Sequence, residues 1–404
     1  MNNPASSRLY FLDWVRILAF MLLILYHVGM YYVSWDWHVK SPYASDAIEP
    51  LMMLTSPWRL GLLFLISGVA SSFMLAKISA GRFMRQRSAR LLVPLLFGML
   101  VIVPPQPYFE VIEKVAYQGS YVDFMRLYVS GYGDFCRKTD CLTLPTWNHL
   151  WFVAYLWVYT LLLGSVVLML GARFDAMAQK VAAFLTGWKL IVVPVAVLGL
   201  VRILLLSRFP STHNLTWDWY NHAQYVPLFL LGAMLARQAG AWQRMDAMRW
   251  SALGMAMASW AALIVWFSLP ESVTLHPDIN TWRMGMRVVY ALCAWSAMVA
   301  ACGFAHRHLN RDSAARRYLA EAVFPVYIVH QTLIVSMAHL MKPAKLAPAT
   351  EGFILVVLTF CVSFGIFAVV RRVAVLRPLF GLGKAVPVDG AKPVIVAGPQ
   401  QKAA

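Results

Sequence analysis

Residues 11–33 read FLDWVRILAFMLLILYHVGMYYV, and this stretch decides the fold because it is long and apolar enough to cross a lipid bilayer. A transmembrane helix needs about 20 such residues. The stretch nevertheless contains Arg16 and His27, and ionisable side chains inside a span are costly unless they face water or a partner. They are eleven residues apart, so on a helix both lie on nearly the same face, about 16 Å apart along the axis. We expect the rest of the chain to surround this face.

The composition of the whole chain is that of a polytopic membrane protein. Of its 404 residues, 60% are hydrophobic and only 13% are charged, against about a quarter in soluble domains. The apolar runs predict an all-α bundle of ten transmembrane helices, at residues 11–33, 57–76, 91–104, 149–170, 188–206, 223–236, 250–269, 282–304, 320–341 and 352–370. We assign residues 1–378 to this membrane domain and predict a disordered cytoplasmic tail at 379–404, which is rich in Gly, Pro, Ala and Val.

The basic residues indicate the orientation of the bundle. Of the 35 Lys and Arg residues, 22 lie in the N-terminus, in the loops that follow the even-numbered spans and in the tail. Another 8 lie in the loops that follow the odd-numbered spans, and 5 lie within or beside spans. Because cytoplasmic loops carry the excess of Lys and Arg, both termini are expected in the cytosol. The formal net charge of +17 is spread over many short loops, so it does not indicate nucleic-acid binding.

The cysteines leave one question open. Cys136 and Cys141 lie in the longest extracytoplasmic loop, 105–148, where they either form a disulfide or remain free thiols. No His-rich or Cys-rich spacing indicates a metal site.

Several polar residues in the outer halves of the spans suit an anionic or strongly polar ligand that enters from outside. The candidate substrate-binding residues are Arg59, His149, Trp151, Arg283, Arg287 and His330. The alternative for His27 is a buried neutral histidine, and for Arg16 a residue paired with Asp13 near the interface. Small residues in the second span, such as Gly68, are expected to allow close helix packing.

An arginine cluster follows the second span on the cytoplasmic side. The segment KISAGRFMRQRSAR, read as a loop, contains Arg82, Arg85, Arg87 and Arg90. Either these residues only set the topology, or some of them bind a phosphate-bearing cytosolic ligand, since arginine matches phosphate geometry. The candidate donor-binding residues are Arg82, Arg85 and Arg90.

Five segments together resemble the acyltransferase-3 family of integral membrane acyltransferases. They are the pair Arg16 and His27, FLISG at 64–68, the arginine-rich segment ending RLLVP at 90–94, HLWF at 149–152 and FPVYIVH at 324–330. The stretch FLDWVRILAF together with WHVKSP at 37–42 is most similar to the branch that contains periplasmic glucan succinyltransferases.

The resemblance implies an enzyme of the bacterial inner membrane with acyl-CoA as co-substrate, no bound cofactor and an extracytoplasmic carbohydrate acceptor, such as a periplasmic glucan. It implies that His27 is catalytic and that Arg16 belongs to the same motif. Many relatives carry a glutamate early in the fourth span, but the run HLWFVAYLW has none.

The chemistry of the residues fits this expectation. A neutral imidazole can remove the proton of an attacking hydroxyl, or it can carry the acyl group itself, and the sequence leaves both roles open for His27. The competing prediction is a transporter or flippase of a polar or lipid-linked glycan, because intramembrane charges also mark transport routes.

Overall fold

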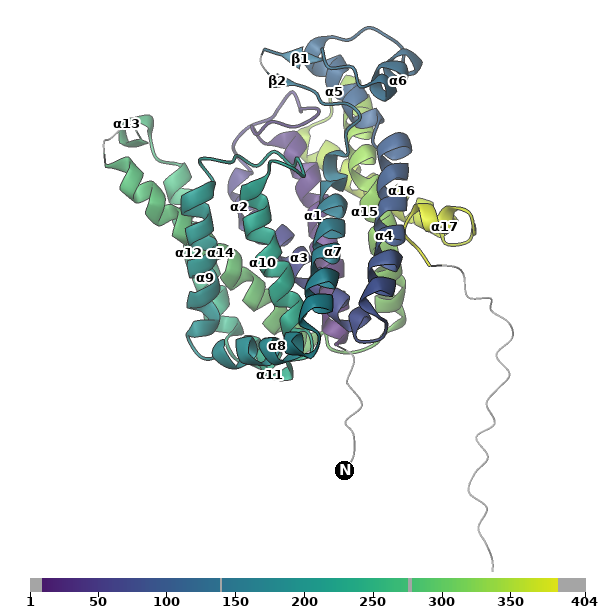
Figure 1. The fold of residues 1–404 in the computed structure, drawn as a ribbon. Coiled ribbons are helices and arrows are strands. Elements are labelled where there is room, and N and C mark those ends of the chain that lie inside the picture. Colours follow the sequence, from purple (N-terminus) through teal and green to yellow (C-terminus); the bar gives the residue numbers. More distant parts are fainter. Residues whose placement is uncertain (1–8, 139, 275–277, 384–404) are drawn as a thin grey trace, which may run out of the picture.

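A computed structural model describes residues 9–138, 140–274 and 278–383. The chain forms a bundle of upright helices with an irregular layer at one end and short crossing helices at the other (Figure 1). Its long helices are α1 (Tyr10–Tyr32), α3 (Arg59–Leu75), α4 (Ala80–Phe97), α7 (Trp151–Leu170), α9 (Lys189–Leu205), α10 (Trp219–Leu235), α12 (Arg249–Phe267), α14 (Ile279–His308), α15 (Ala314–Met341) and α16 (Pro348–Val370).

The remaining elements are shorter. They are α2 (Glu49–Thr55), the π-helical turn Gly98–Ile102, α5 (Pro105–Val115), α6 (Tyr121–Ser130), β1 (Cys136–Arg137), β2 (Asp140–Cys141), the 3-10 turns Asn148–Leu150 and Lys342–Ala344, α8 (Ala172–Phe184), α11 (Ala239–Ala247), α13 (Glu271–Thr274) and α17 (Leu376–Leu379). The antiparallel pair β1 and β2 is closed by a disulfide between Cys136 and Cys141.

The described residues contain seven helices long and apolar enough to cross a membrane. Two bent pairs, Ala80–Ile102 with Pro105–Val115 and Ala172–Phe184 with Lys189–Leu205, bring the number to nine if each pair is one span. Helix α10, which overlaps the expected span 223–236, has 17 residues, at the lower limit of what crosses the hydrocarbon core. The chain is therefore an all-α polytopic membrane protein, and ten spans with both termini in the cytosol stay a prediction.

Three segments expected as loops contain regular structure. Residues 80–97 form α4, so the arginine cluster lies on a helix, because Arg, Gln, Ala and Leu all favour helix. The segment 105–148 contains α5, α6 and the hairpin, and the segment 171–189 contains α8. These predictions missed helices whose charged residues interrupt the apolar pattern. Of the expected tail, residues 379–383 are described, with Phe380 buried; 384–404 lie outside the described residues.

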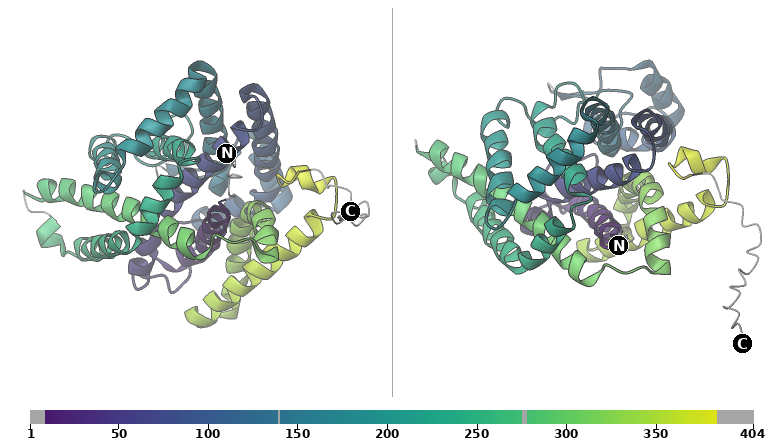
Figure 2. Two further views of the ribbon diagram at one scale, coloured as in Figure 1. Left: turned by 90° about the horizontal axis from the view of Figure 1, so that it is seen from below. Right: turned by 60° about the horizontal axis from the view of Figure 1, so that its bottom comes forward.

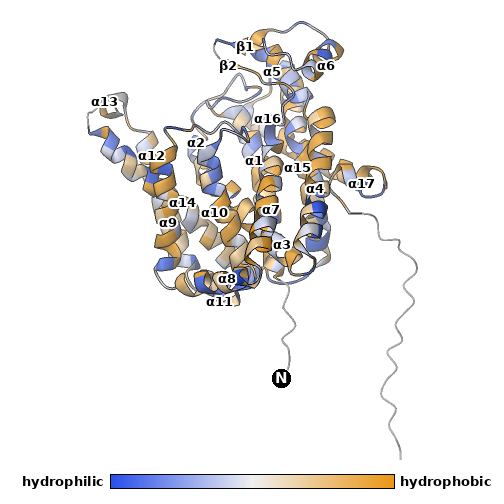
Figure 3. Cartoon of the chain, in the orientation of Figure 1, coloured by the Kyte–Doolittle hydropathy of each residue, from blue (hydrophilic) through white to orange (hydrophobic). Residues whose placement is uncertain are grey.

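Apolar residues cover most of the upright helices, and polar residues gather near α8 and α11 (Figure 3). Helices α3 and α10 touch backbone to backbone: a Cβ on Gly68 would overlap the carbonyl oxygen of Phe229, and one on Gly232 would overlap that of Leu65. The expected packing role of Gly68 is thus confirmed, since small residues allow such contact in membranes.

Helix α1 lies near the centre of the bundle when it is viewed from below (Figure 2, left). It packs against α3, α14, α15 and α16. Beyond its C-terminus, the ammonium of Lys40 donates to the carbonyl oxygens of Met30 and Trp35, at 2.7 and 2.8 Å, and to that of Val33. A cation there satisfies the unpaired carbonyls of a helix end and complements its dipole. The end of α1 that carries His27 is therefore held in place.

Candidate active site

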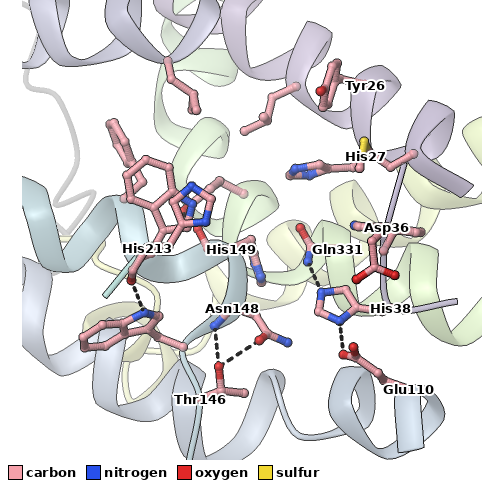
Figure 4. Close-up of a pocket in the computed structure, with 18 of the residues that line it drawn as sticks. Tyr26, His27, Asp36, His38, Glu110, Thr146, Asn148, His149, His213 and Gln331 are labelled. Carbon is pink, nitrogen blue, oxygen red and sulfur yellow. Dashed lines mark hydrogen bonds and ion pairs between the residues drawn. The ribbon is translucent and has the colours of Figure 1, made fainter. Parts of the chain in front are cut away.

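A cavity of about 470 Å³ opens beside the C-terminal half of α1, and we name it the histidine cavity. Its size is within the range of about 300–1,000 Å³ that is usual for ligand sites. Side chains from α1, α3, α5, α7, α15 and the adjoining loops face a common space (Figure 4). Residues that line it include Tyr26, His27, Asp36, Trp37, His38, Arg59, Glu110, Thr146, Trp147, Asn148, His149, Trp151, Phe152, His213, Tyr327 and Gln331.

His27 is held by a hydrogen bond to a second histidine. Its Nδ1 lies 2.7 Å from Nε2 of His330, whose Nδ1 lies 2.6 Å from the carbonyl oxygen of Tyr327. A carbonyl oxygen only accepts, so Nδ1 of His330 donates and, in the neutral ring, Nε2 accepts. His27 must then donate from Nδ1, which leaves its Nε2 with a free lone pair. This tautomer is the one that a base or a nucleophile requires.

His149 has both ring nitrogens occupied. Its Nε2 donates to the carbonyl oxygen of Ile328 at 3.0 Å, and its Nδ1 accepts from the amide of Gln106 at 3.3 Å. Gln106 is fully buried and also donates to Thr332 at 2.7 Å. His149 therefore fixes α7 against α15 and leaves no free nitrogen for a substrate.

Arg59 supplies a positive charge to the histidine cavity. Its guanidinium lies over the ring of Tyr26, with Cζ 3.2 Å from the ring centroid. The side chain is 6% exposed, and within the described residues Nε and Nη1 have no hydrogen-bond partner. A buried polar group normally has a partner, so these two donors are an exception, in a side chain that lines the histidine cavity.

The cavity also contains a histidine and a carboxylate that the sequence analysis did not select. His38 donates from Nδ1 to Glu110 at 2.5 Å, and its Nε2 accepts from the amide of Gln331 at 3.0 Å. Glu110 provides a carboxylate in the cavity that His27 lines, although the fourth span has none. The sequence could have indicated this carboxylate through the spacing of Gln106, Glu110 and Glu113, which places the three polar residues on one face of α5.

Aromatic rings form one wall of the cavity. The ring of His213 stacks on Trp151 with centroids 4.3 Å apart, and the indole of Trp147 donates to the carbonyl oxygen of His213 at 3.1 Å. Buried Asp218 holds this loop, because it accepts from the backbone N–H of His213 at 3.1 Å. Burial lowers the pKa of His213 below its ordinary value, so at neutral pH the ring is uncharged and contributes a flat face.

A second cavity, of about 500 Å³, lies beside the N-terminal half of α1, and we name it the arginine cavity. Arg16, Arg87 and Arg90 line it together with Arg377 and Glu321. Arg16 donates to the carbonyl oxygen of Ala320 at 3.1 Å and lies 3.7 Å from Asp13. The residues Arg16 and His27, expected on one face of α1, thus line two different cavities along that helix.

A single aromatic side chain borders both cavities. Phe152 contributes to the lining of each, and its ring lies 6.3 Å from that of Tyr327, which in turn lies 5.2 Å from that of Phe20. Phe20 lines the arginine cavity and Tyr327 the histidine cavity. The wall between the cavities is therefore one side chain thick at Phe152.

Other candidates lie outside these cavities. Arg283 is exposed and donates to Asn280 at 3.0 Å, and Arg287 donates to the carbonyl oxygen of Ile203 at 3.0 Å; neither lines the histidine cavity. Arg82 and Arg85 lie on the exposed side of α4 and do not line the arginine cavity, whereas Arg87, which was not selected, does. The roles expected for these residues stay predictions.

Comparison with known proteins defines the class. Residues 9–368 match the acyltransferase-3 family, described as an acyltransferase domain, so the chain belongs to this family. It is a multi-pass membrane acyltransferase. It is similar to the glucans biosynthesis protein C of Salmonella heidelberg (strain SL476) and of Salmonella agona (strain SL483), with 24% identity over 94% of this chain and 96% of each relative. No solved structure matches the chain significantly.

The hydrogen bond between the two histidines yields a prediction. His330→Leu removes the acceptor that orients His27, so we expect kcat to fall by about tenfold or more with little change in KM. His330→Gln keeps an acceptor and should retain more of the activity. Acyl-transfer rates measured across pH check this, because loss of the fixed tautomer should also alter the pH profile. If both variants lost the same fraction of activity and the pH profile stayed unchanged, His330 would have only a packing role.

Proposed function

We propose that the protein transfers an acyl group, succinyl or acetyl, from cytosolic acyl-CoA to a hydroxyl of an extracytoplasmic carbohydrate such as a periplasmic glucan, in a bacterial inner membrane. The observation that carries this proposal is the pair of cavities along α1, one with His27 and one with arginines, separated at Phe152 by one side chain. The name of the relatives, glucans biosynthesis protein C, supports a glucan as acceptor.

The histidine cavity suits a carbohydrate. Its lining combines the flat rings of Trp37, Trp147 and Trp151 with hydrogen-bonding groups from Asp36 and Asn148. Sugars present apolar C–H faces and many hydroxyls, so they bind where aromatic faces and a few placed polar groups meet.

The arginine cavity suits the phosphates of CoA. Arg87 and Arg90 lie one turn apart on α4, and Arg16 faces them from α1. Arginine pairs with phosphate through charge-assisted, often bidentate hydrogen bonds. With the phosphates held there, the thioester arm would pass Phe152 to reach His27.

The transfer step uses the free lone pair of His27. Nε2 takes the proton of the acceptor hydroxyl while the hydroxyl oxygen attacks the thioester carbonyl carbon. The carbon–sulfur bond then breaks, and the leaving thiolate takes the proton from the imidazolium to give free CoA. Arg59, which lines the same cavity, supplies the positive charge that stabilises the negative oxygen of the intermediate.

The function is tested with purified protein, succinyl-CoA or acetyl-CoA and a glucan, by following CoA release and mass analysis of the glycan. His27→Ala is expected to lower turnover by about 10²-fold or more, because general-base catalysis contributes that much. Turnover like the wild type in this variant would remove His27 from the mechanism. Movement of an unmodified glycan across the membrane with no CoA consumed would support a flippase instead.

The two sides of α4 give a matched test of the donor site. Arg87→Gln removes a charge that lines the arginine cavity, so KM for acyl-CoA should rise by about tenfold, the value of one hydrogen bond to a charged group. Arg82→Gln, on the exposed side of the same helix, should leave it unchanged, which would exclude the donor-binding role expected for Arg82 from the sequence. KM values for acyl-CoA at a fixed acceptor concentration check this, and equal effects of the two variants would contradict the assignment.

A further inference from the structure

A smaller hollow of about 180 Å³ lies next to the histidine cavity, beneath the hairpin β1–β2. The two spaces share four lining residues, Asp36, Glu110, Lys114 and Thr146. The ammonium of Lys114 lies 3.0 Å from a carboxylate oxygen of Asp36 and 2.9 Å from one of Glu110. The hollow therefore continues the histidine cavity on the other side of a bridge made by these three charged side chains.

The far side of this hollow is polar and belongs to the hairpin region. Arg137 and Thr143 line it and are exposed, next to Cys141 of the disulfide and the buried ring of Phe135. Guanidinium, hydroxyl and carboxylate groups together match the hydroxyls of a sugar, which both donate and accept. The carboxylates of Asp36 and Glu110 disfavour a phosphate-bearing ligand at the same place.

The volume indicates what kind of ligand enters. At about 180 Å³ the hollow is smaller than the usual site for a whole small molecule. It fits one unit of a ligand whose other units occupy the histidine cavity. A ligand that is a chain of repeated polar units can occupy both spaces in this way.

We propose that the hollow is a second acceptor subsite, which binds a sugar unit of an oligosaccharide whose other units occupy the histidine cavity, where one of them is acylated at His27. This inference rests on the proposed function. It adds that the enzyme favours a glycan chain over a short sugar, and that the hairpin β1–β2 and the bridge at Lys114 determine this preference.

The test compares a glucose disaccharide with a glucose hexasaccharide of the same linkage as acceptors, with acyl-CoA in excess. Arg137→Ala removes a charged donor from the hollow, and Thr143→Trp fills it. In both variants KM for the hexasaccharide should rise by about tenfold, while KM for the disaccharide and kcat for both acceptors stay unchanged. The wild-type protein should have the lower KM for the hexasaccharide.

Matched controls come from α6, which also belongs to the segment 105–148. Arg126→Ala and Ser130→Trp change exposed residues that do not line the hollow, so neither should alter any KM. Equal KM values of the wild-type protein for the two acceptors, or equal effects of Arg137→Ala on both, would overturn the subsite and leave the proposed function standing. Absence of transfer from the wild-type protein to either acceptor would overturn the proposed function itself.

Discussion

The hydrogen bond from His27 to His330 is the constraint on which the rest of the site depends. It joins α1 to α15 across 303 residues of sequence. Within a bilayer, a buried ring nitrogen has no water to bind and must find a partner in the protein. The carbonyl oxygen of Tyr327 fixes the tautomer of His330, and His330 fixes that of His27. One backbone group thus determines that Nε2 of His27, and not Nδ1, carries the free lone pair.

The two cavities along α1 differ in charge, and this difference would direct the acyl donor and the acceptor to different cavities. Arginines dominate one cavity, whereas the other combines Arg59 with the carboxylates of Asp36 and Glu110. A polyanionic donor is attracted by the first and a neutral, hydroxyl-rich acceptor suits the second. Among the described residues, Phe152 alone lines both cavities, so an apolar side chain separates them at this point.

The sequence predicted what depends on local pattern. Helical periodicity was enough to place Arg16 and His27 on one face of α1, and the structure gives each of them a cavity. The apolar runs gave the approximate positions of the long helices. The first part of α4, residues 80–90, was read as a loop because its arginines interrupt the apolar pattern, although arginine favours helix.

Contacts between distant segments were not predictable in this way. The hydrogen bond between His38 and Glu110 joins residues that are 72 apart in the sequence. Helical periodicity cannot predict a contact between segments so distant. Glu110 lies on α5, within the segment 105–148 that was expected as a loop. Arg82 and Arg87 lie on different sides of α4, so their different surroundings follow from how α4 packs against α7 and α17.

In the proposed reaction, two reactants from opposite sides of the membrane reach one imidazole. Proteoliposomes that enclose isotope-labelled acyl-CoA, with the glycan added only outside, test this most directly. Label should appear on the external glycan while CoA accumulates inside, and His27→Ala should abolish both. Transfer that occurs only when donor and acceptor share one compartment would contradict it.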